Sequence, residues 1–371
     1  MLCYFPCSNR NKSIRESNPV KKLNIISPSI KHGGGMERYI CTLIDHLSED
    51  YTVDIFCLKY DNKCFKNNNH VNIYQSKVIR HFPRFLKYFA FACKVYFKTR
   101  KTHILNITTA RIFNPDIVIV GGTHRMHNLA MGKKDGWYDK VEIFLEKKCY
   151  QHAKYIIAHS PLMIEEINAY HLGIENKIKM LFPPVASDKF TFATSEDKNL
   201  LRKKLKLPEK TYLIFIAGTE DKRKGVPEAI KAVSKLGDPY FLMIFGKTCN
   251  IKLPHNAKHF GVVNNIDEYY KAADITLVPS IYEPFGLVVI ESLQVGTPVI
   301  LSKYVGAKTL VNENNSIIIE GQPNANNIIT ALKSATTKTW CCNKNFIQDK
   351  KLSWQHHIAA LEKIIDRILE N

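Results

Sequence analysis

The sequence lacks several features that would place it in a common class of protein. It has no run of roughly 18 uncharged apolar residues, the least that a membrane-spanning helix needs. It has no C-x-x-C pair, and its ten cysteines mostly stand alone in apolar segments, where a free thiol behaves as a small hydrophobic side chain. We therefore predict no spanning helix, disulfide framework or zinc site, and the cysteine pattern favours a reducing, cytoplasmic compartment.

Acidic side chains are also scarce. Only 34 Asp and Glu face 53 Lys and Arg, which gives a net charge of +19, and most of this excess lies in residues 1–185. Such a basic protein is expected to meet an anionic partner: nucleic acid, an acidic membrane surface or a phosphorylated substrate. In other respects, 371 residues of which 45% are hydrophobic and 23% charged predict a globular protein of two domains.

Short apolar runs, Gly- or Pro-containing turns and amphipathic helices alternate along the chain, an order typical of a parallel sheet covered on both faces. The pattern stops at the proline-containing segment 181–190 and the Lys-rich stretch 194–210, and then starts again. The predicted strands are 23–30, 52–58, 116–122, 155–160, 211–218, 240–246, 259–263, 274–280 and 297–302, with helices from Met36 and Pro161 and over 226–236 and 266–273.

We therefore predict an α/β protein of two doubly wound, Rossmann-like domains facing a central cleft at the carboxyl ends of their strands. The N-terminal start is polar after a short apolar stretch and has no signal-peptide core. The predicted parts are a flexible tail (1–21), an N-terminal domain (22–187), a C-terminal domain (188–351) and an amphipathic helix (352–371) that returns to the N-terminal domain.

The most informative segment is 279–300, PSIYEPFGLVVIESLQVGTPVI. A strand ends at Ser280, a loop carries Glu283, and a helix begins near Gly286 with Glu291 about two turns inside it. The free N–H groups of a helix N-terminus attract phosphate, and a glycine there lets a ligand approach the backbone. Glu283 is then placed to accept hydrogen bonds from sugar hydroxyls and Glu291 from a ribose. A solvated loop carboxylate and an ordinary helix glutamate remain the alternative.

A second loop combines glycine with basic side chains. Gly218 ends a strand, and Lys222, Arg223 and Lys224 precede the next helix. Three cations at the carboxyl end of a strand suit a diphosphate, whereas a solvated basic turn is the alternative.

A third glycine-rich segment is HGGGMER at 32–38, between a strand and a helix. It contains neither G-x-G-x-x-G nor a Walker lysine, so neither a dinucleotide fingerprint nor a P-loop is predicted. Its glycines permit close approach of a ligand, and a tight turn without a ligand is the alternative.

Taken together, these segments resemble a known family. The E-x7-E spacing from Glu283 to Glu291 occurs with GGGMER, KRKGV and AADITLVPS…GTPVI in the order found in retaining glycosyltransferases of family 4, which have the GT-B fold. The resemblance extends over about residues 22–368, and TEDKRKG is most similar to the lipopolysaccharide core glucosyltransferases. Many relatives have an arginine directly after the glycine, where this chain has Thr219, and that branch lacks it too.

The resemblance implies roles for these residues. Glu283 would bind donor-sugar hydroxyls, Glu291 the nucleotide ribose, and Arg223 with Lys224 would neutralise the leaving diphosphate. The family needs no bound metal, and no D-x-D motif occurs here. The implied donor site is Gly34, Gly35, Gly218, Arg223, Lys224, Glu283, Pro284, Phe285, Gly286, Leu287 and Glu291, with backbone amides contributing near Gly286.

The implied catalytic residues are Glu283, Arg223, Lys224 and, more loosely, His124. His124 follows the strand 116–122, so it is expected to face the cleft, although a surface or core histidine is an equal alternative; His127 is a weaker candidate. Transfer in this family is described as a front-face attack through an oxocarbenium-like state, so no covalent nucleophile is expected.

The basic segment 77–101 has eight Lys or Arg residues and no acid. Aromatic rings at helical spacing beside lysines are typical of a helix lying on an anionic membrane. The alternative is a domain helix that packs these rings in the core. The proposed apolar face is Phe82, Phe85, Leu86, Phe89, Cys93, Tyr96 and Phe97, with Lys87, Lys94 and Lys98 on the rest of the helix.

These features together predict an enzyme that moves a hexose from a nucleotide diphosphate sugar, above all a UDP-sugar, to a sugar on lipopolysaccharide or another lipid-linked glycan. It would be cytoplasmic and peripheral on the inner face of the plasma membrane, and would use no cofactor, since the nucleotide sugar is a co-substrate. The alternatives are a GT-B non-transferase such as a sugar-nucleotide epimerase, and a catalytically dead basic membrane-interaction protein. No nucleic-acid partner is expected, because no known nucleic-acid module accompanies the basic segment.

Overall fold

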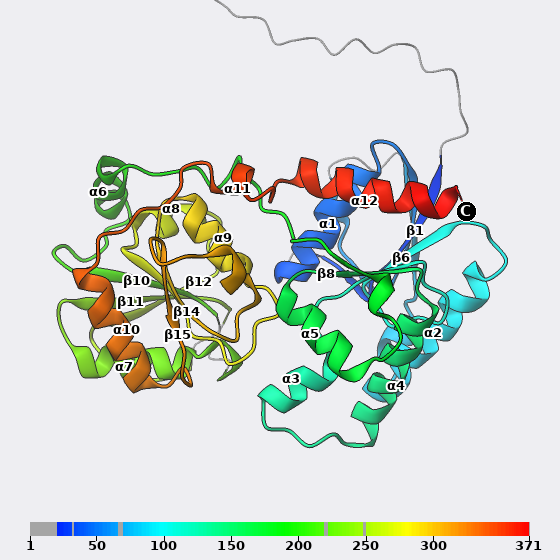
Figure 1. Ribbon diagram of the computed structural model, residues 1–371, viewed down its shortest axis with the longest axis horizontal. Coiled ribbons are helices and arrows are strands. Elements are labelled where there is room, and N and C mark those ends of the chain that lie inside the picture. Colours follow the sequence, from blue (N-terminus) through cyan, green and yellow to red (C-terminus); the bar gives the residue numbers. More distant parts are fainter. Residues whose placement is uncertain (1–20, 32, 66–69, 219–221, 248–249, 371) are drawn as a thin grey trace, which may run out of the picture.

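The computed structural model describes residues 21–370 except 32, 66–69, 219–221 and 248–249, and it shows two α/β domains side by side (Figure 1). Almost all of the predicted tail, and Thr219, lie outside the described residues. The cysteines within them are free thiols, as the sequence predicted.

The N-terminal domain is built on a seven-stranded sheet in the order β5-β3-β1-β6-β7-β8-β9, in which all neighbours run parallel. Its strands are β1 (Lys22–Ile26), β3 (Thr52–Cys57), β5 (Val71–Gln75), β6 (Leu105–Thr108), β7 (Ile117–Ile119), β8 (Tyr155–Ala158) and β9 (Ile178–Met180). Two short strands, β2 (Ser29–Ile30) and β4 (Lys59–Tyr60), pair separately.

The C-terminal domain repeats this design with a six-stranded parallel sheet in the order β12-β11-β10-β13-β14-β15. Its strands are β10 (Tyr212–Ala217), β11 (Tyr240–Phe245), β12 (Ala257–Gly261), β13 (Ile275–Val278), β14 (Val299–Ser302) and β15 (Ser316–Ile319). In both sheets the chain winds outward from the first strand and then reverses direction, which leaves a crevice at the carboxyl ends where the order switches. The predicted pair of doubly wound domains is confirmed.

Helices cover both sheets (Figure 1). They are α1 (Gly35–Leu47), α2 (Arg84–Thr99), α3 (His124–Ala130), α4 (Trp137–His152), α5 (Pro161–Tyr170), α6 (Ser195–Lys204), α7 (Val226–Leu236), α8 (Ile266–Ala272), α9 (Leu287–Gln294), α10 (Ala325–Thr337), α11 (Phe346–Asp349) and α12 (Trp354–Leu369). The one-turn helices that matter below are η4 (Lys222–Lys224) and η5 (Gly306–Leu310).

The last helix leaves the C-terminal domain and lies against the N-terminal one (Figure 1). Leu361, Ile365 and Ile368 of α12 are buried in the same cluster as Leu23 and Ile25 of β1. Apolar residues at three- and four-residue spacing give α12 one buried face, and this face completes the N-terminal core.

A helix lies where the sequence predicted only a polar break. The Lys-rich stretch 194–210 contains helix α6, whose N-terminus is capped by the Thr194 hydroxyl and the Asp197 carboxylate, so it is part of the C-terminal domain and not only a polar break.

Helix α2 turns the face that was expected to meet a membrane away from the core. Phe91, Ala92 and Val95 are buried, whereas Phe89 and Phe97 are 44% and 65% exposed. The exposed rings belong to the face that the sequence assigned to a membrane, so the alternative in which this face fills the core is wrong for Phe82, Phe89 and Phe97. The core is filled from the opposite side of the helix, which is also apolar because apolar residues occur all around it. Contact with a membrane stays a prediction.

Candidate active site

Helix α9 begins at the mouth of the C-terminal crevice, after a tightly turned loop from β13. Gly286 caps the helix with a φ of +100°, a conformation that residues with a side chain rarely adopt. A Cβ there would lie 2.8 Å from Cγ1 of Val305. Glycine at this position therefore lets the loop turn and leaves the first N–H groups of α9 open to an anion.

The basic loop that follows β10 is locked against this α9 loop. The N–H of Ile281 donates to the carbonyl oxygen of Arg223 at 2.9 Å. Gly225 has a φ of +72°, and a Cβ on it would overlap the carbonyl oxygen of Pro279. Gly218 lies beneath the same loop, where an added Cβ would meet Cβ of Lys224 at 3.1 Å. Residues 222–225 and the α9 loop therefore form one packed unit.

The carboxylate of Glu283 sits at the centre of this unit. Its Oε2 accepts a hydrogen bond from Nη1 of Arg223 at 3.3 Å and is also contacted by Nζ of Lys224. Arg223 is further oriented by the carbonyl oxygen of Tyr282, 2.9 Å from Nη1. Residues that the sequence assigned to different tasks, the sugar and the diphosphate, thus form one half-buried acid–cation cluster beside the N-terminus of α9.

Glu291 is buried and meets the other domain. Its Oε1 accepts from Nη2 of Arg38 at 3.2 Å, and its Oε2 accepts from the hydroxyl of Tyr270 at 2.8 Å. Arg38 belongs to α1 of the N-terminal domain, so this ion pair crosses the cleft. Its charge-assisted geometry fixes the direction in which the carboxylate points.

Arg38 and Glu291 line a cavity of about 220 Å³ between the domains. Gly35 of α1 faces Leu287 of α9 across it, and a Cβ on Gly35 would lie 3.4 Å from Leu287 Cδ1. Gly34 borders open space instead. The start of α1 thus lies close to the start of α9 at Gly35.

Further polar contacts join the domains on the other side of the α9 loop. The hydroxyl of Ser160, at the start of α5, donates to the carbonyl oxygen of Pro284 at 2.6 Å. The hydroxyl of Tyr282 donates to Oε2 of Glu166 at 2.9 Å, and Thr123 reaches the same oxygen at 3.3 Å. Burial raises the pKa of Glu166 to about 7, against the effect of these two hydrogen bonds.

The two histidines that follow β7 have different surroundings. Nε2 of His124 lies 2.7 Å from Oδ1 of Asp139 on α4, and the pKa of Asp139 is lowered to about 2, chiefly by this hydrogen bond. The ring of His127 lies 6.2 Å from the ring of Tyr282, centre to centre. His124 is thus held by its own domain, whereas His127, the weaker candidate in the sequence, borders the α9 loop.

The other residues of the implied donor site near Gly286 are Pro284, Phe285 and Leu287, and they face different parts of the molecule. Pro284 and Leu287 contact the N-terminal domain, whereas the Phe285 ring is buried in the C-terminal core and packs against Phe182 at 6.0 Å between centroids. Phe285 therefore offers only its backbone to a ligand.

Sequence reasoning missed Arg38, Tyr270, Tyr282 and Glu166. The available signal for Arg38 was its place three residues after Gly35, on the same face of α1. The others gave no signal, because their partners are far away in the sequence.

In the part of the chain that the structure describes, no three His, Cys, Asp or Glu side chains converge in the manner of a metal site. Among the same residues, no helix is both long enough and apolar enough to cross a membrane.

Two Rossmann-like domains with an anion-binding helix start between them are the architecture of GT-B glycosyltransferases. Two family models match the chain in the order of its domains: "Glycosyltransferase Family 4" at residues 33–213 and "Glycosyl transferases group 1" at residues 197–351. A probable transglycosylase of Burkholderia thailandensis is 30% identical over 286 residues, which cover 75% of this chain and 76% of that protein. The chain belongs to the family-4 glycosyltransferases.

Solved structures agree with this assignment in fold. WaaG, described as a glycosyltransferase involved in lipopolysaccharide biosynthesis, has a TM-score of 0.73 at 17% identity, over 85% of this chain and 91% of that one. Anabaena HepE in complex with UDP-glucose has a TM-score of 0.71 at 14% identity, over 94% of this chain and the whole of the other. At these identities the likeness shows the GT-B fold alone.

Proposed function

We propose that this glycosyltransferase moves a hexose from a UDP-sugar to a sugar on lipopolysaccharide or another lipid-linked glycan, with retention of anomeric configuration. The observation that carries the donor part is the cluster of Glu283 with Arg223 and Lys224 at the start of α9. It offers a carboxylate to sugar hydroxyls and two cations to a diphosphate within one packed unit.

The charge balance of this cluster suits the transfer step. When the bond from the anomeric carbon to the diphosphate breaks, its electron pair stays on the leaving oxygen, and negative charge grows on the phosphate. Arg223, Lys224 and the N–H groups of α9 are already fixed beside that position, so they stabilise this charge without reorganising. We propose that no metal ion is needed, because these groups supply the positive charge. The oxygen of the acceptor hydroxyl then bonds to the anomeric carbon from the face that the diphosphate leaves, and the hydroxyl proton passes to the departing phosphate oxygen, with no covalent enzyme intermediate.

The cavity between α1 and α9 suits the nucleoside. Glu291 faces it with a carboxylate whose direction is set by Arg38 and Tyr270, and each carboxylate oxygen keeps lone pairs for a ribose hydroxyl. HepE, which has the same fold, is described in complex with UDP-glucose, and this supports UDP as the nucleotide. His124 is proposed to contact the donor sugar, with its ring oriented by Asp139.

The proposed acceptor is a glycan carried by a lipid, and the enzyme is proposed to be cytoplasmic and peripheral on the inner face of the plasma membrane. We call the exposed side of α2 the α2 surface; its apolar members are Phe82, Leu86, Phe89 and Phe97, and its cations include Lys94 and Lys98. Exposed aromatic rings beside lysines are suited to the headgroup region of an anionic membrane. The description of WaaG supports a lipopolysaccharide acceptor.

A panel of nucleotide sugars tests the donor. We expect one UDP-hexose to raise the melting temperature of the wild-type protein, and Glu291→Gln to reduce that shift. Glu283→Gln should lower the transfer rate, because the hydrogen bonds to the sugar and the charge balance are both weakened. Glu313→Gln, an exposed carboxylate of the same domain, is the matched control and should change neither. Analysis of the product anomer tests retention. The proposal fails if no nucleotide sugar binds, or if all three variants behave alike.

The rival functions give different results in the same assays. When the donor is supplied without an acceptor, an epimerase would convert the donor sugar into its epimer, whereas a transferase would leave the donor sugar as it is. A dead enzyme would bind the donor and transfer nothing to any lipid extract.

Vesicles test the α2 surface. Anionic vesicles should retain the protein at low salt and release it at high salt, because surface charge is screened. Neutralising Lys87, Lys94 and Lys98 with glutamine should weaken retention and leave donor binding unchanged. Equal retention on neutral vesicles would contradict the electrostatic part.

A further inference from the structure

A cavity of about 840 Å³ opens in the N-terminal domain, on the side away from the candidate active site. Its lining includes Asn106 at the start of β6, Asp116 just before β7 and Lys154 just before β8. Ser160, which contacts the α9 loop, follows β8 at its other end. Because the strands are parallel, the cavity lies at one edge of the sheet and the candidate active site at the opposite edge.

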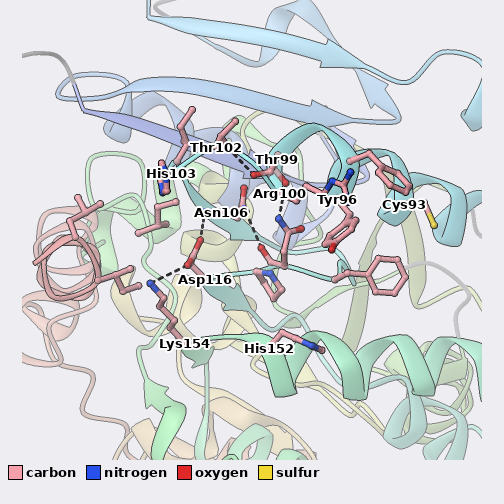
Figure 2. A pocket seen from close by; sticks show the side chains of 18 residues that line it. Cys93, Tyr96, Thr99, Arg100, Thr102, His103, Asn106, Asp116, His152 and Lys154 are labelled. Carbon is pink, nitrogen blue, oxygen red and sulfur yellow. Dashed lines mark hydrogen bonds and ion pairs between the residues drawn. The ribbon is translucent and has the colours of Figure 1, made fainter. Parts of the chain in front are cut away.

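The lining comes from separate parts of the chain that meet only in the fold (Figure 2). The last turns of α2 contribute Tyr96, Phe97 and Arg100, the end of α4 contributes His152, and α12 contributes Leu369. The cavity also adjoins the α2 surface, since Phe97 belongs to both.

The charged groups of the lining leave an excess of positive charge. Its single carboxylate, Asp116, is already engaged: Oδ2 accepts from the N–H of Asn106 at 2.8 Å, and Oδ1 lies 3.5 Å from Nζ of Lys154 (Figure 2). The guanidinium of Arg100 lies 5.0 Å from the centre of the Phe97 ring, and within the described residues no carboxylate forms an ion pair with it. Arg100 and Lys154 are exposed, and because Lys154 is paired with Asp116, the three charged groups leave one uncompensated positive charge for an anion that enters here.

The neutral part of the wall is held in place by hydrogen bonds. Nδ2 of Asn114 donates to the hydroxyl oxygen of Thr99 at 2.9 Å, and Nδ2 of Asn106 donates to the carbonyl oxygen of Asn114 at 2.9 Å. The hydroxyl of Thr102 donates to the carbonyl oxygen of Thr99 at 2.9 Å and keeps its lone pairs for a ligand hydroxyl. A wall fixed in this way does not have to be ordered when a ligand arrives, so binding costs less conformational entropy.

We propose that this cavity binds a phosphorylated polyol or sugar. Arg100 and Lys154 attract the phosphate, Thr102 and His103 meet hydroxyl groups, and the ring of Phe97 packs against the carbon skeleton. A bare phosphate ion would fill only a small part of the cavity, whose volume is in the range of sites for whole small molecules. The same chemistry occurs in the headgroup of an anionic glycerophospholipid and in a free phosphorylated metabolite.

Glycerol 3-phosphate and glucose 6-phosphate are suitable probes, with glycerol and glucose as their uncharged counterparts. We expect at least one phosphorylated probe to bind the full-length protein. The double variant Arg100→Gln/Lys154→Gln should raise its dissociation constant at least about tenfold, because two charged hydrogen-bond donors are lost. Lys94→Gln/Lys98→Gln is the matched control: it removes the same charge from exposed positions of α2 outside the cavity, and should leave the dissociation constant unchanged.

The thiol of Cys93 gives a readout that does not depend on the variants, because Cys93 also lines the cavity. A bound probe should slow the alkylation of Cys93, measured by mass spectrometry of its peptide. Cys341, an exposed thiol of the C-terminal domain, is the internal control and should react at an unchanged rate. The proposal is overturned if neither probe binds, if both double variants weaken binding equally, or if Cys93 is not protected at saturation.

Vesicles of phosphatidylglycerol and of phosphatidylcholine distinguish the two sources of the ligand. If the ligand is a lipid headgroup, Arg100→Gln/Lys154→Gln should reduce retention on phosphatidylglycerol, and glycerol 3-phosphate should compete with the vesicles. If it is a free metabolite, the probe binds as described and vesicle retention does not respond to that double variant. Neither assay involves transfer, so a failure here is distinct from a failure of the proposed transferase function.

Discussion

Glu166 provides a sharp test of the contact between the domains, because burial controls its ionisation. The residue is only 4% exposed, its Oε2 accepts from Tyr282 and Thr123, and its Oε1 has no hydrogen-bond partner within the described structure. Glu166→Gln preserves the shape and an acceptor oxygen for Tyr282, but it cannot ionise. We expect the stability of this variant relative to wild type to increase as the pH rises.

The magnitude follows from the two pKa values of the carboxyl group. Burial raises the pKa of Glu166 from 4.5 to about 7 in the folded protein. Between these values the unfolded chain has lost its proton while the folded chain keeps it, so wild-type stability falls as the pH rises through this window. Above pH 7 both states are ionised and the loss is complete. This difference in pKa corresponds to a loss of roughly 3 kcal/mol in the free energy of unfolding. Glutamine cannot ionise, so the variant does not lose this stability.

The assay is chemical and thermal unfolding of both proteins at intervals from pH 4.5 to pH 8. The glutamine amide also changes the free energy of unfolding by an amount that does not depend on pH. The quantity to follow is therefore how the difference in stability between the variant and wild type changes with pH. Glu165→Gln is the matched control, because Glu165 is the exposed neighbour on the same helix. A difference between Glu166→Gln and wild type that stays constant across this range would refute the reasoning, as would an equal change for Glu165→Gln.

Three further predictions concern the site and the contact of α12 with the N-terminal domain, where the buried His357 of α12 meets the hydroxyl of Tyr39. Gly286→Ala should lower the free energy of unfolding by roughly 1–3 kcal/mol, because it strains a residue with a φ of +100° and pushes a methyl group against Val305. Thermal unfolding measures this loss, and an unchanged melting temperature would contradict the prediction. Arg38→Ala should weaken nucleotide-sugar binding about tenfold in calorimetry, because Glu291 loses the ion pair that orients it, and an unaltered affinity would show that Arg38 has no such role. Burial lowers the pKa of His357 from 6.5 to about 3, so wild-type stability should fall as the pH drops below 6.5. His357→Gln cannot take up this proton and should avoid about 2 kcal/mol of the loss by pH 5. If the stability of variant and wild type falls in parallel in acid, the prediction is contradicted.

The contacts that join the domains explain why several site residues were invisible in the sequence. Arg38 and Glu291 are 253 residues apart, and Tyr282 and Glu166 are 116 residues apart. No local pattern relates residues at such distances, since periodicity reports only which face of one element is apolar. The same limit explains why spacing alone left open whether the aromatic face of α2 is exposed or buried.

Short strands were the other weakness of the sequence-based prediction. Strand β6 was not predicted, because LNIT offers four residues without a distinct alternation, yet it pairs with β1 and β7 in the middle of the sheet. The predicted strand 23–30 is divided at Ser27 and Pro28, because proline lacks the N–H that continuous pairing requires.

The sequence by itself determined what depends on neighbouring residues. It predicted the alternation of strands and helices in two domains, the glycine that starts α9, and the chemical types of Glu283, Glu291, Arg223 and Lys224, because strand, turn and helix signals act over a few residues. Only the tertiary structure decided that one carboxylate holds both cations, that α1 reaches Glu291 across the cleft, and that a second cavity forms at the opposite edge of the sheet. These features arise where distant segments meet, and their free energy comes from burial and hydrogen bonds that exist only after the chain has folded.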